Sequence, residues 1–183
     1  IIPVLKEASE RVNFGGIWHS DTAYLDLPPM ASMLIAREVP PAGGDTLFAS
    51  QYLAYEALSD GMKRLLEGLR AVHSDRRVAG PQAGMNAYRA TKVREEGWEE
   101  TVSTHPVVRT HPETGRKGLY VNAAFTSHIV GMEPEEGDRL LERLYRQASV
   151  PEYQCRFRWR RHSIAFWDNR CVQHNPVNDY HGF

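Results

Sequence analysis

Short apolar and β-branched stretches, separated by turns rich in Pro, Gly and Asp, recur toward both ends of the chain. This pattern is typical of strands joined by tight turns. Pro28-Pro29 and the stretch 40–45 are the clearest breaks between them. The pattern predicts extended segments at 17–25, 32–39, 46–48, 107–109, 119–121, 153–159 and 163–167.

Apolar residues at helical spacing occupy the middle of the chain and predict helices at 52–58, 62–69 and 134–147. The stretch 80–97 combines Gly, Pro, Asn and many charges, so we expect a loop or lid there. Strands on both sides of a helical insert predict a mainly β fold with helical insertions, of the jelly-roll type.

The composition narrows the function classes. A chain of 183 residues suits a single domain with a substantial core. Its net charge of -1 creates no long-range field that would gather nucleic acid or an anionic membrane, so we expect neither as a partner. No stretch approaches the ~20 apolar residues that cross a bilayer. Cys155 and Cys171 are too few for a disulfide framework and suggest reduced thiols in a cytoplasmic protein.

The two ends of the sequence look unlike natural termini. The first residue is not Met, and the last residues follow closely on a candidate metal ligand. We therefore expect residues 1–183 to be a single catalytic domain that lacks its N-terminal and C-terminal segments.

The candidate chemistry lies in Trp18-His19-Ser20-Asp21 and in one distant histidine, His174. Side chains two positions apart on a strand point to the same face, so His19 and Asp21 can grip one ion. Two imidazoles and one carboxylate form the facial triad of non-haem Fe(II) oxygenases. On spacing alone, the alternative that these are unconnected surface residues stays open. The other histidines sit in turns or beside charges and are interpreted as solvated or structural.

A run of motifs in fixed order resembles the taurine dioxygenase family, whose members depend on Fe(II) and 2-oxoglutarate. The motifs extend over most of the chain. They are Trp18-His19-Ser20-Asp21, Pro28-Pro29, Gly43-Gly44-Asp45-Thr46-Leu47-Phe48, Ala54-Tyr55-Glu56-Ala57-Leu58, His105-Pro106-Val107-Val108-Arg109-Thr110-His111-Pro112, Leu119-Tyr120-Val121-Asn122, and Trp167-Asp168-Asn169-Arg170 through His174.

The resemblance implies a double-stranded β-helix that holds Fe(II) through His19, Asp21 and His174. It further implies 2-oxoglutarate and O2 as cosubstrates, with Thr46 binding a 2-oxoglutarate carboxylate. The cosubstrate is converted to succinate and CO2 while a C–H bond of a small organic acid is hydroxylated. The family's arginine clamp for the far carboxylate would fall at position 185, beyond Phe183, and a second arginine for the substrate would follow it.

The substrate is expected to be a sulfonate, an alkyl sulfate or an aryloxyalkanoate. Gly15 stands where taurine-specific members carry Asn, which argues against strict use of taurine. By resemblance, Thr22, Asn122 and Phe125 are candidate substrate-binding residues, although Phe125 also suits a core position. The alternatives are a non-catalytic metal-binding jelly-roll protein of the same family and a hydrolase that uses another metal. Self-association is a further expectation, because related enzymes are often dimers or tetramers.

Overall fold

The computed structural model describes residues 2–80, 83 and 97–182, and most of the predicted loop 80–97 lies outside them. The described part is mainly β with a few helices. Its elements are β1 (Ala31–Ile35), β2 (Thr46–Ser50), α1 (Gln51–Glu56), α2 (Asp60–Leu66), β3 (Arg70–Ser74), α3 (Arg76–Ala79), β4 (Val102–Pro106), β5 (Val108–Thr110), β6 (Lys117–Leu119), β7 (Thr126–Ile129), α4 (Pro134–Ala148), the 3-10 helix η2 (Pro151–Tyr153), β8 (Gln154–Phe157), β9 (Ile164–Asp168) and β10 (Val172–Pro176).

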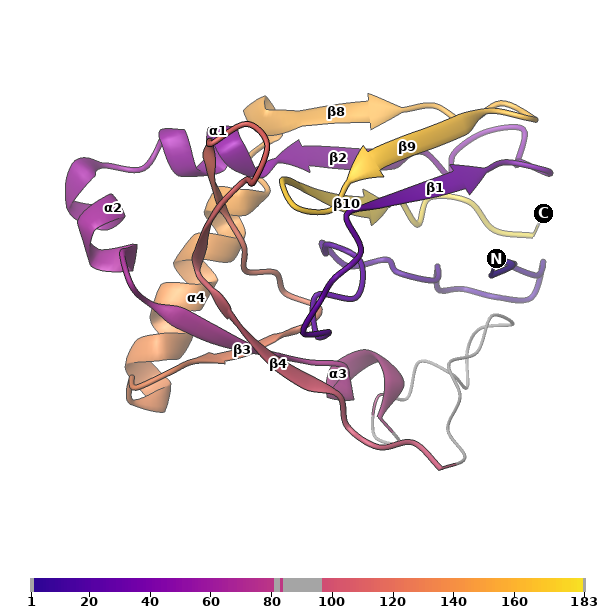
Figure 1. Cartoon of the computed structure of the whole chain (residues 1–183). Coiled ribbons are helices and arrows are strands. Elements are labelled where there is room, and N and C mark those ends of the chain that lie inside the picture. Colours follow the sequence, from indigo (N-terminus) through magenta and orange to yellow (C-terminus); the bar gives the residue numbers. More distant parts are fainter. Residues whose placement is uncertain (1, 81–82, 84–96, 183) are drawn as a thin grey trace.

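Two antiparallel sheets bring distant parts of the chain together, in the order β10-β2-β8 and β1-β9. Figure 1 shows these strands gathered on one side of the molecule, away from α4. An aromatic contact links the two sheets: the ring centroids of Phe48 on β2 and Trp167 on β9 lie 5.3 Å apart. The segments near the two ends also meet, because Lys6 Nζ donates a hydrogen bond of 2.8 Å to Asn178 Oδ1.

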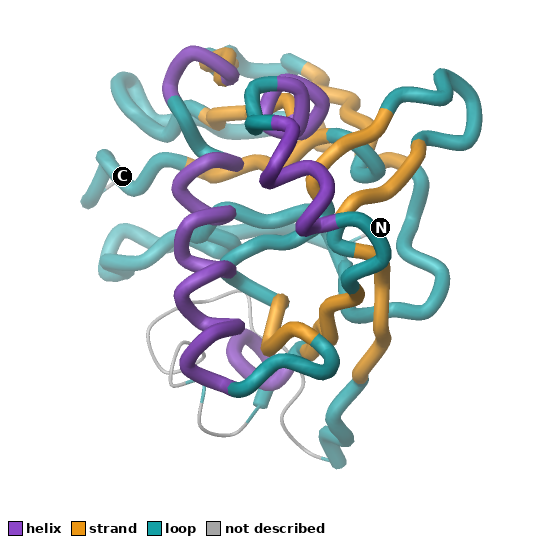
Figure 2. The backbone as a smooth tube through the Cα atoms, turned by 90° about the vertical axis from the view of Figure 1, so that its left-hand side faces the viewer, coloured by secondary structure: helices purple, strands orange, loops and turns teal. Residues whose placement is uncertain are grey.

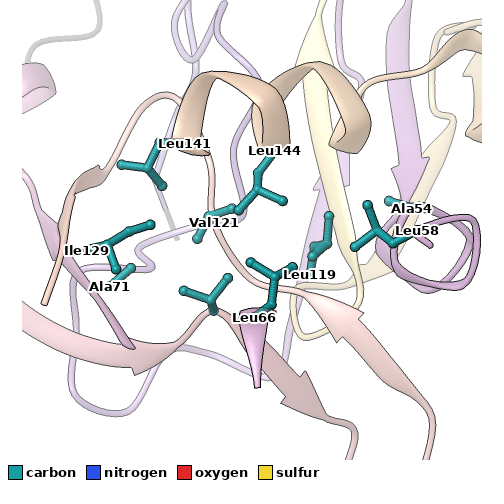
Figure 3. Close-up of a cluster of buried hydrophobic side chains, with 10 residues drawn as sticks. Ala54, Leu58, Leu66, Ala71, Leu119, Val121, Ile129, Leu141 and Leu144 are labelled. Carbon is teal, nitrogen blue, oxygen red and sulfur yellow. The ribbon is translucent and has the colours of Figure 1, made fainter. Parts of the chain in front are cut away.

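Helix α4 packs against β7, an edge strand of a third sheet of order β4-β3-β7 (Figure 2). It begins at Pro134, whose missing N–H costs nothing in a first turn, and Glu135 and Glu136 complement the dipole there. Leu141 and Leu144 form its buried side. Figure 3 shows how this side meets apolar residues from α1, α2, β3, β6 and β7 in the main hydrophobic core.

Several predicted elements are confirmed, with altered ends. β2 continues to Ser50, β9 covers most of 163–167, β8 is shorter than 153–159, and α4 matches the predicted helix at 134–147 within one residue. No described helix is long and apolar enough to cross a membrane.

The prediction of an extended segment over 17–25 was wrong beyond its beginning. His19 forms an isolated bridge with His174, and the chain then turns from Asp21 onward. Thr22 has a φ of 47°, a left-handed conformation that no regular strand accommodates. The predicted strand at 119–121 also shifts, because β6 ends at Leu119.

Candidate metal centre

His19 and His174 lie side by side because their backbones pair. The His19 N–H donates to the carbonyl of His174 at 3.1 Å, and the His174 N–H donates to the carbonyl of His19 at 2.8 Å. His174 belongs to β10, whose place in the sheet is fixed by its pairing with β2. This double hydrogen bond sets the two imidazole rings 4.2 Å apart, centroid to centroid.

Asp21 completes the group. Its Oδ1 atom lies 3.4 Å from His19 Nε2 and 3.7 Å from His174 Nε2. The candidate ligand atoms of the three residues all lie within 4.8 Å of one another. The His19 Nδ1 atom is 2.6 Å from the carbonyl oxygen of Ile17, which can only accept, so Nδ1 carries the proton. The lone pair of His19 Nε2 is therefore on the side of Asp21 and His174.

The surroundings favour the charged form of Asp21 and the neutral form of His174. Burial opposes the charged form of Asp21, but the nearby imidazoles of His19 and His174 and the hydrogen bond from Ser32 outweigh it and lower the carboxyl pKa. Burial and the neighbouring His19 lower the pKa of His174, which keeps that imidazole neutral. An ionised carboxylate beside neutral imidazoles is the form in which these side chains bind a metal.

A cavity of about 140 Å³ opens beside His19 and Asp21. Apart from His19 and Asp21, its walls are mostly apolar or aromatic and include the candidates Thr22 and Phe125. The Phe125 ring stands edge-on to His19, at 5.9 Å between centroids. The lining residues are Phe14, Gly15, Gly16, Ile17, His19, Asp21, Thr22, Tyr24, Val78, Ala79, Ala124 and Phe125.

Gly15 passes close to the metal centre. Its φ is +73°, and a Cβ atom added there would lie 3.1 Å from His19 Cε1. A side chain at this position would be strained and would press on the imidazole. The backbone can therefore approach His19 closely at this wall of the cavity.

Thr46 and Asn122 have different surroundings. Thr46, buried at the start of β2, lies two residues from Phe48 and so shares its face of the strand, and Phe48 stacks on the His174 ring. Its Oγ1 accepts a hydrogen bond of 3.0 Å from Trp159 Nε1.

Asn122 is not one of the residues that line the cavity. Its amide oxygen accepts a hydrogen bond of 2.9 Å from the Phe125 N–H and shapes the turn that carries Phe125.

The family model described as "Taurine catabolism dioxygenase TauD, TfdA family" matches residues 4–182. The chain belongs to this family. One relative is an alpha-ketoglutarate-dependent sulfonate dioxygenase from Saccharomyces cerevisiae. It is 37% identical to this chain, and the match covers 90% of this chain and 39% of that protein. Another is an alpha-ketoglutarate-dependent 2,4-dichlorophenoxyacetate dioxygenase from Cupriavidus pinatubonensis, 38% identical over 92% of this chain and 58% of that protein.

Among solved structures, the chain is similar to a taurine dioxygenase from Burkholderia xenovorans, with a TM-score of 0.74 and 39% identity. That match covers 88% of this chain and 52% of the other. The chain thus spans only about half the length of the TauD/TfdA proteins that it resembles.

A second group of possible ligand atoms, from His111, Asp168 and Cys171, lies outside the cavity. The carboxylate of Asp168 is already paired with the Arg170 guanidinium. Arg170 Nη2 donates a hydrogen bond of 2.6 Å to one Asp168 oxygen, and Arg170 Nε donates one of 2.9 Å to the other. Burial opposes ionisation of Asp168, but these bonds outweigh it and lower its pKa to about 2. Because a fixed cation neutralises this carboxylate, the group is an ion-pair network in this TauD/TfdA chain.

Residues that the sequence analysis did not single out also belong to the site. Ser32, Trp167 and Asn169 surround the metal-facing side chains, and Trp159 holds Thr46. Trp167 and Asn169 lie inside the motif that ends at His174, but no periodicity in the sequence indicates what each of them does. Ser32 is the one polar residue of an otherwise apolar strand, which is the signal that could have identified it.

Proposed function

We propose that this protein is an Fe(II)- and 2-oxoglutarate-dependent dioxygenase that hydroxylates a small anionic organic substrate. The observation that carries the proposal is the convergence of His19, Asp21 and His174, of which His19 and Asp21 line a mostly apolar cavity. Family membership supports it, since the relatives above are named alpha-ketoglutarate-dependent dioxygenases.

The donor set fits a metal ion of this kind. Ligands bound at about 2.1 Å and at right angles to one another lie about 3.0 Å apart. The distances of 3.4 and 3.7 Å from Asp21 Oδ1 to the two imidazoles are close to that spacing. Two nitrogens and one oxygen on one side of an ion suit Fe(II) and leave the other side open. We assign the three residues as the metal ligands on these grounds.

When bound, Fe(II) with 2-oxoglutarate and O2 supplies the oxidant for C–H hydroxylation, while the cosubstrate is decarboxylated to succinate. The protein's own residues orient the reactants and exclude water. Thr46 is proposed to donate its hydroxyl to a 2-oxoglutarate carboxylate. Trp159 supports that role, because its N–H occupies the acceptor side of Oγ1 and leaves the hydroxyl hydrogen to point elsewhere.

The apolar lining of the cavity favours a substrate whose part nearest the proposed metal site is apolar. Phe125, Val78 and Ala79 line the cavity, and desolvating a charged group against such walls would be costly. Thr22 and Phe125 are proposed to contact the substrate, and Asn122 to act by holding Phe125 in place. Sulfonates, alkyl sulfates and aryloxyalkanoates all combine such an apolar part with an anionic end.

The finer structural expectations form part of the same proposal. The β10-β2-β8 and β1-β9 sheets, with His19 bridged to β10, support a double-stranded β-helix. We propose that residues 1–183 are the catalytic domain of a longer enzyme, since the relatives are longer. The free thiols of Cys155 and Cys171 support a reducing compartment such as the cytoplasm.

Succinate release tests this function. The purified protein is supplied with Fe(II) and 2-oxoglutarate and challenged with taurine, alkyl sulfates and aryloxyalkanoates, with and without O2. We expect O2-dependent succinate that rises with at least one anionic substrate and is absent in His19→Ala. Substrate turnover that persists without O2 and 2-oxoglutarate would indicate a hydrolase. A protein that binds the metal but never forms succinate would be a non-catalytic binding protein.

A further inference from the structure

The carboxylate of Asp21 has two oxygens, and only one of them faces the imidazoles. Oδ1 is the atom near His19 and His174, whereas Oδ2 accepts a hydrogen bond from the hydroxyl of Ser32. Ser32 lies on β1, directly across from Trp167 on β9. A regular strand pair therefore brings a hydroxyl donor to the side of the carboxylate that faces away from the imidazoles.

Asn169 controls the direction of that hydrogen bond. Its amide oxygen accepts from the Trp167 indole Nε1–H at 3.0 Å and from the backbone N–H of Asp21 at 3.4 Å. Both partners can only donate at these atoms, so the orientation of the amide is fixed. Its Nδ2 then faces Ser32 Oγ at 2.9 Å and must donate to it. Since Oγ already accepts this bond, the Ser32 hydrogen is directed to Asp21.

Asn169 is itself held rigidly. It is 1% exposed, and its backbone N–H donates to the carbonyl of Met30 at 2.9 Å. Asp21, Asn169 and Ser32 thus form a closed ring of hydrogen bonds, which grips both the backbone and the side chain of Asp21. A closed hydrogen-bond network in which each of these polar groups has a partner favours one geometry.

We propose that Ser32 and Asn169 are positioning residues that hold Asp21 as a one-oxygen metal ligand. Because Ser32 holds Oδ2 turned away from the imidazoles, Oδ1 is the oxygen presented to the ion, and a one-oxygen ligand would leave further coordination positions for the cosubstrate and O2. The inference rests on the proposed function, because it takes Asp21 to be a metal ligand. Loss of such an outer hydrogen bond to a ligand typically weakens metal binding or activity 10- to 100-fold.

Metal titration of the full chain tests the inference without recourse to turnover. Mn(II) binding is measured by calorimetry for wild type and for Ser32→Ala, with Ser32→Thr as the conservative variant that restores the hydroxyl. Ser163→Ala is the matched control, because Ser163 lies just before β9 and its hydroxyl accepts a hydrogen bond from the Arg160 N–H. The expected dissociation constant rises 10- to 100-fold in Ser32→Ala and stays close to wild type in Ser32→Thr and Ser163→Ala.

Asn169→Asp tests the direction of the hydrogen bond. The new carboxylate is nearly isosteric but cannot donate, so it would draw the Ser32 hydrogen away from Asp21. We expect weaker Mn(II) binding here too, and an altered visible absorption of the Co(II)-loaded protein, since that absorption reports coordination number. Thermal unfolding of the metal-free variants separates this effect from loss of fold. If Asn169→Asp unfolds, the two Ser32 variants still decide the matter.

Asp21→Ala distinguishes the failure of this inference from the failure of the proposed function. If Asp21→Ala abolishes Mn(II) binding while Ser32→Ala binds like wild type with an unchanged Co(II) spectrum, the positioning role is refuted and the metal site stands. If Asp21→Ala also binds like wild type, the metal site itself is wrong.

Discussion

The buried imidazole of His73 makes the protein sensitive to acid in a way that can be calculated. His73 lies on β3 with no exposed surface, and its Nε2 has no hydrogen-bond partner among the described residues. Burial, reinforced by the neighbouring His105 and Arg109, lowers its pKa from 6.5 to about 3. The folded protein therefore keeps this imidazole neutral at pH values where the unfolded chain protonates it.

The sign and the magnitude follow from this difference in pKa. Above about pH 6.5, His73 is neutral in both states and does not lower the free energy of unfolding. As the pH drops from about 6.5 toward 3, the free energy of unfolding falls, because only the unfolded chain gains the proton. Each pH unit costs about 1.4 kcal/mol, so the loss from His73 at pH 5 is about 2 kcal/mol. His105, whose pKa burial also lowers, adds to the same trend.

Urea unfolding at about pH 7.5 and about pH 5 measures the effect. We expect His73→Gln to reduce the fall in unfolding free energy between these pH values by about 2 kcal/mol. His128→Gln, at an exposed position on β7, is the matched control and should leave the fall unchanged. A His73→Gln variant with the full wild-type loss at pH 5 would refute the reasoning.

Three further predictions concern the core and the site. Leu144→Ala should lower the free energy of unfolding by about 2–5 kcal/mol, because Leu144 is fully buried, whereas Leu65→Ala, at a half-exposed position, should cost much less in the same urea assay. Ala79→Phe should fill the cavity and raise KM for the organic substrate. Calorimetry should show that its Mn(II) affinity is unchanged. An unchanged KM would argue against this cavity as the substrate site. Thr46→Val should raise KM for 2-oxoglutarate about tenfold or more without weakening Mn(II) binding, since a hydrogen bond to a carboxylate is lost, and an unchanged KM would remove Thr46 from the cosubstrate site.

The sequence predicted best those elements whose pattern is set by burial on one face. The long helix α4 carries its leucines at helical spacing, and β2 and β9 are apolar strands bounded by turns. Strands β3, β4, β7 and β10 escaped prediction because they bury polar residues. His73 and His105 on β3 and β4, and Gln173 and His174 on β10, are all buried.

The approach of His19, Asp21 and His174 was expected from spacing and family resemblance, but the stated reason was partly wrong. His19 and Asp21 do not lie on one regular strand. The chain turns at Asp21, and the carboxylate reaches the imidazoles with the help of Ser32 and Asn169. Asn169 contacts Asp21 and Ser32 from more than a hundred positions away along the chain, so no local pattern could predict its part in the site.

Anaerobic titration with Fe(II) tests the central claim most directly, since the account stands on His19, Asp21 and His174 holding one metal ion. We predict that the wild-type protein binds one Fe(II) per chain and that His174→Ala, which removes a proposed ligand at the centre of β10, loses this binding while keeping its fold by circular dichroism. Undiminished binding of one Fe(II) by the folded His174→Ala protein would contradict the account.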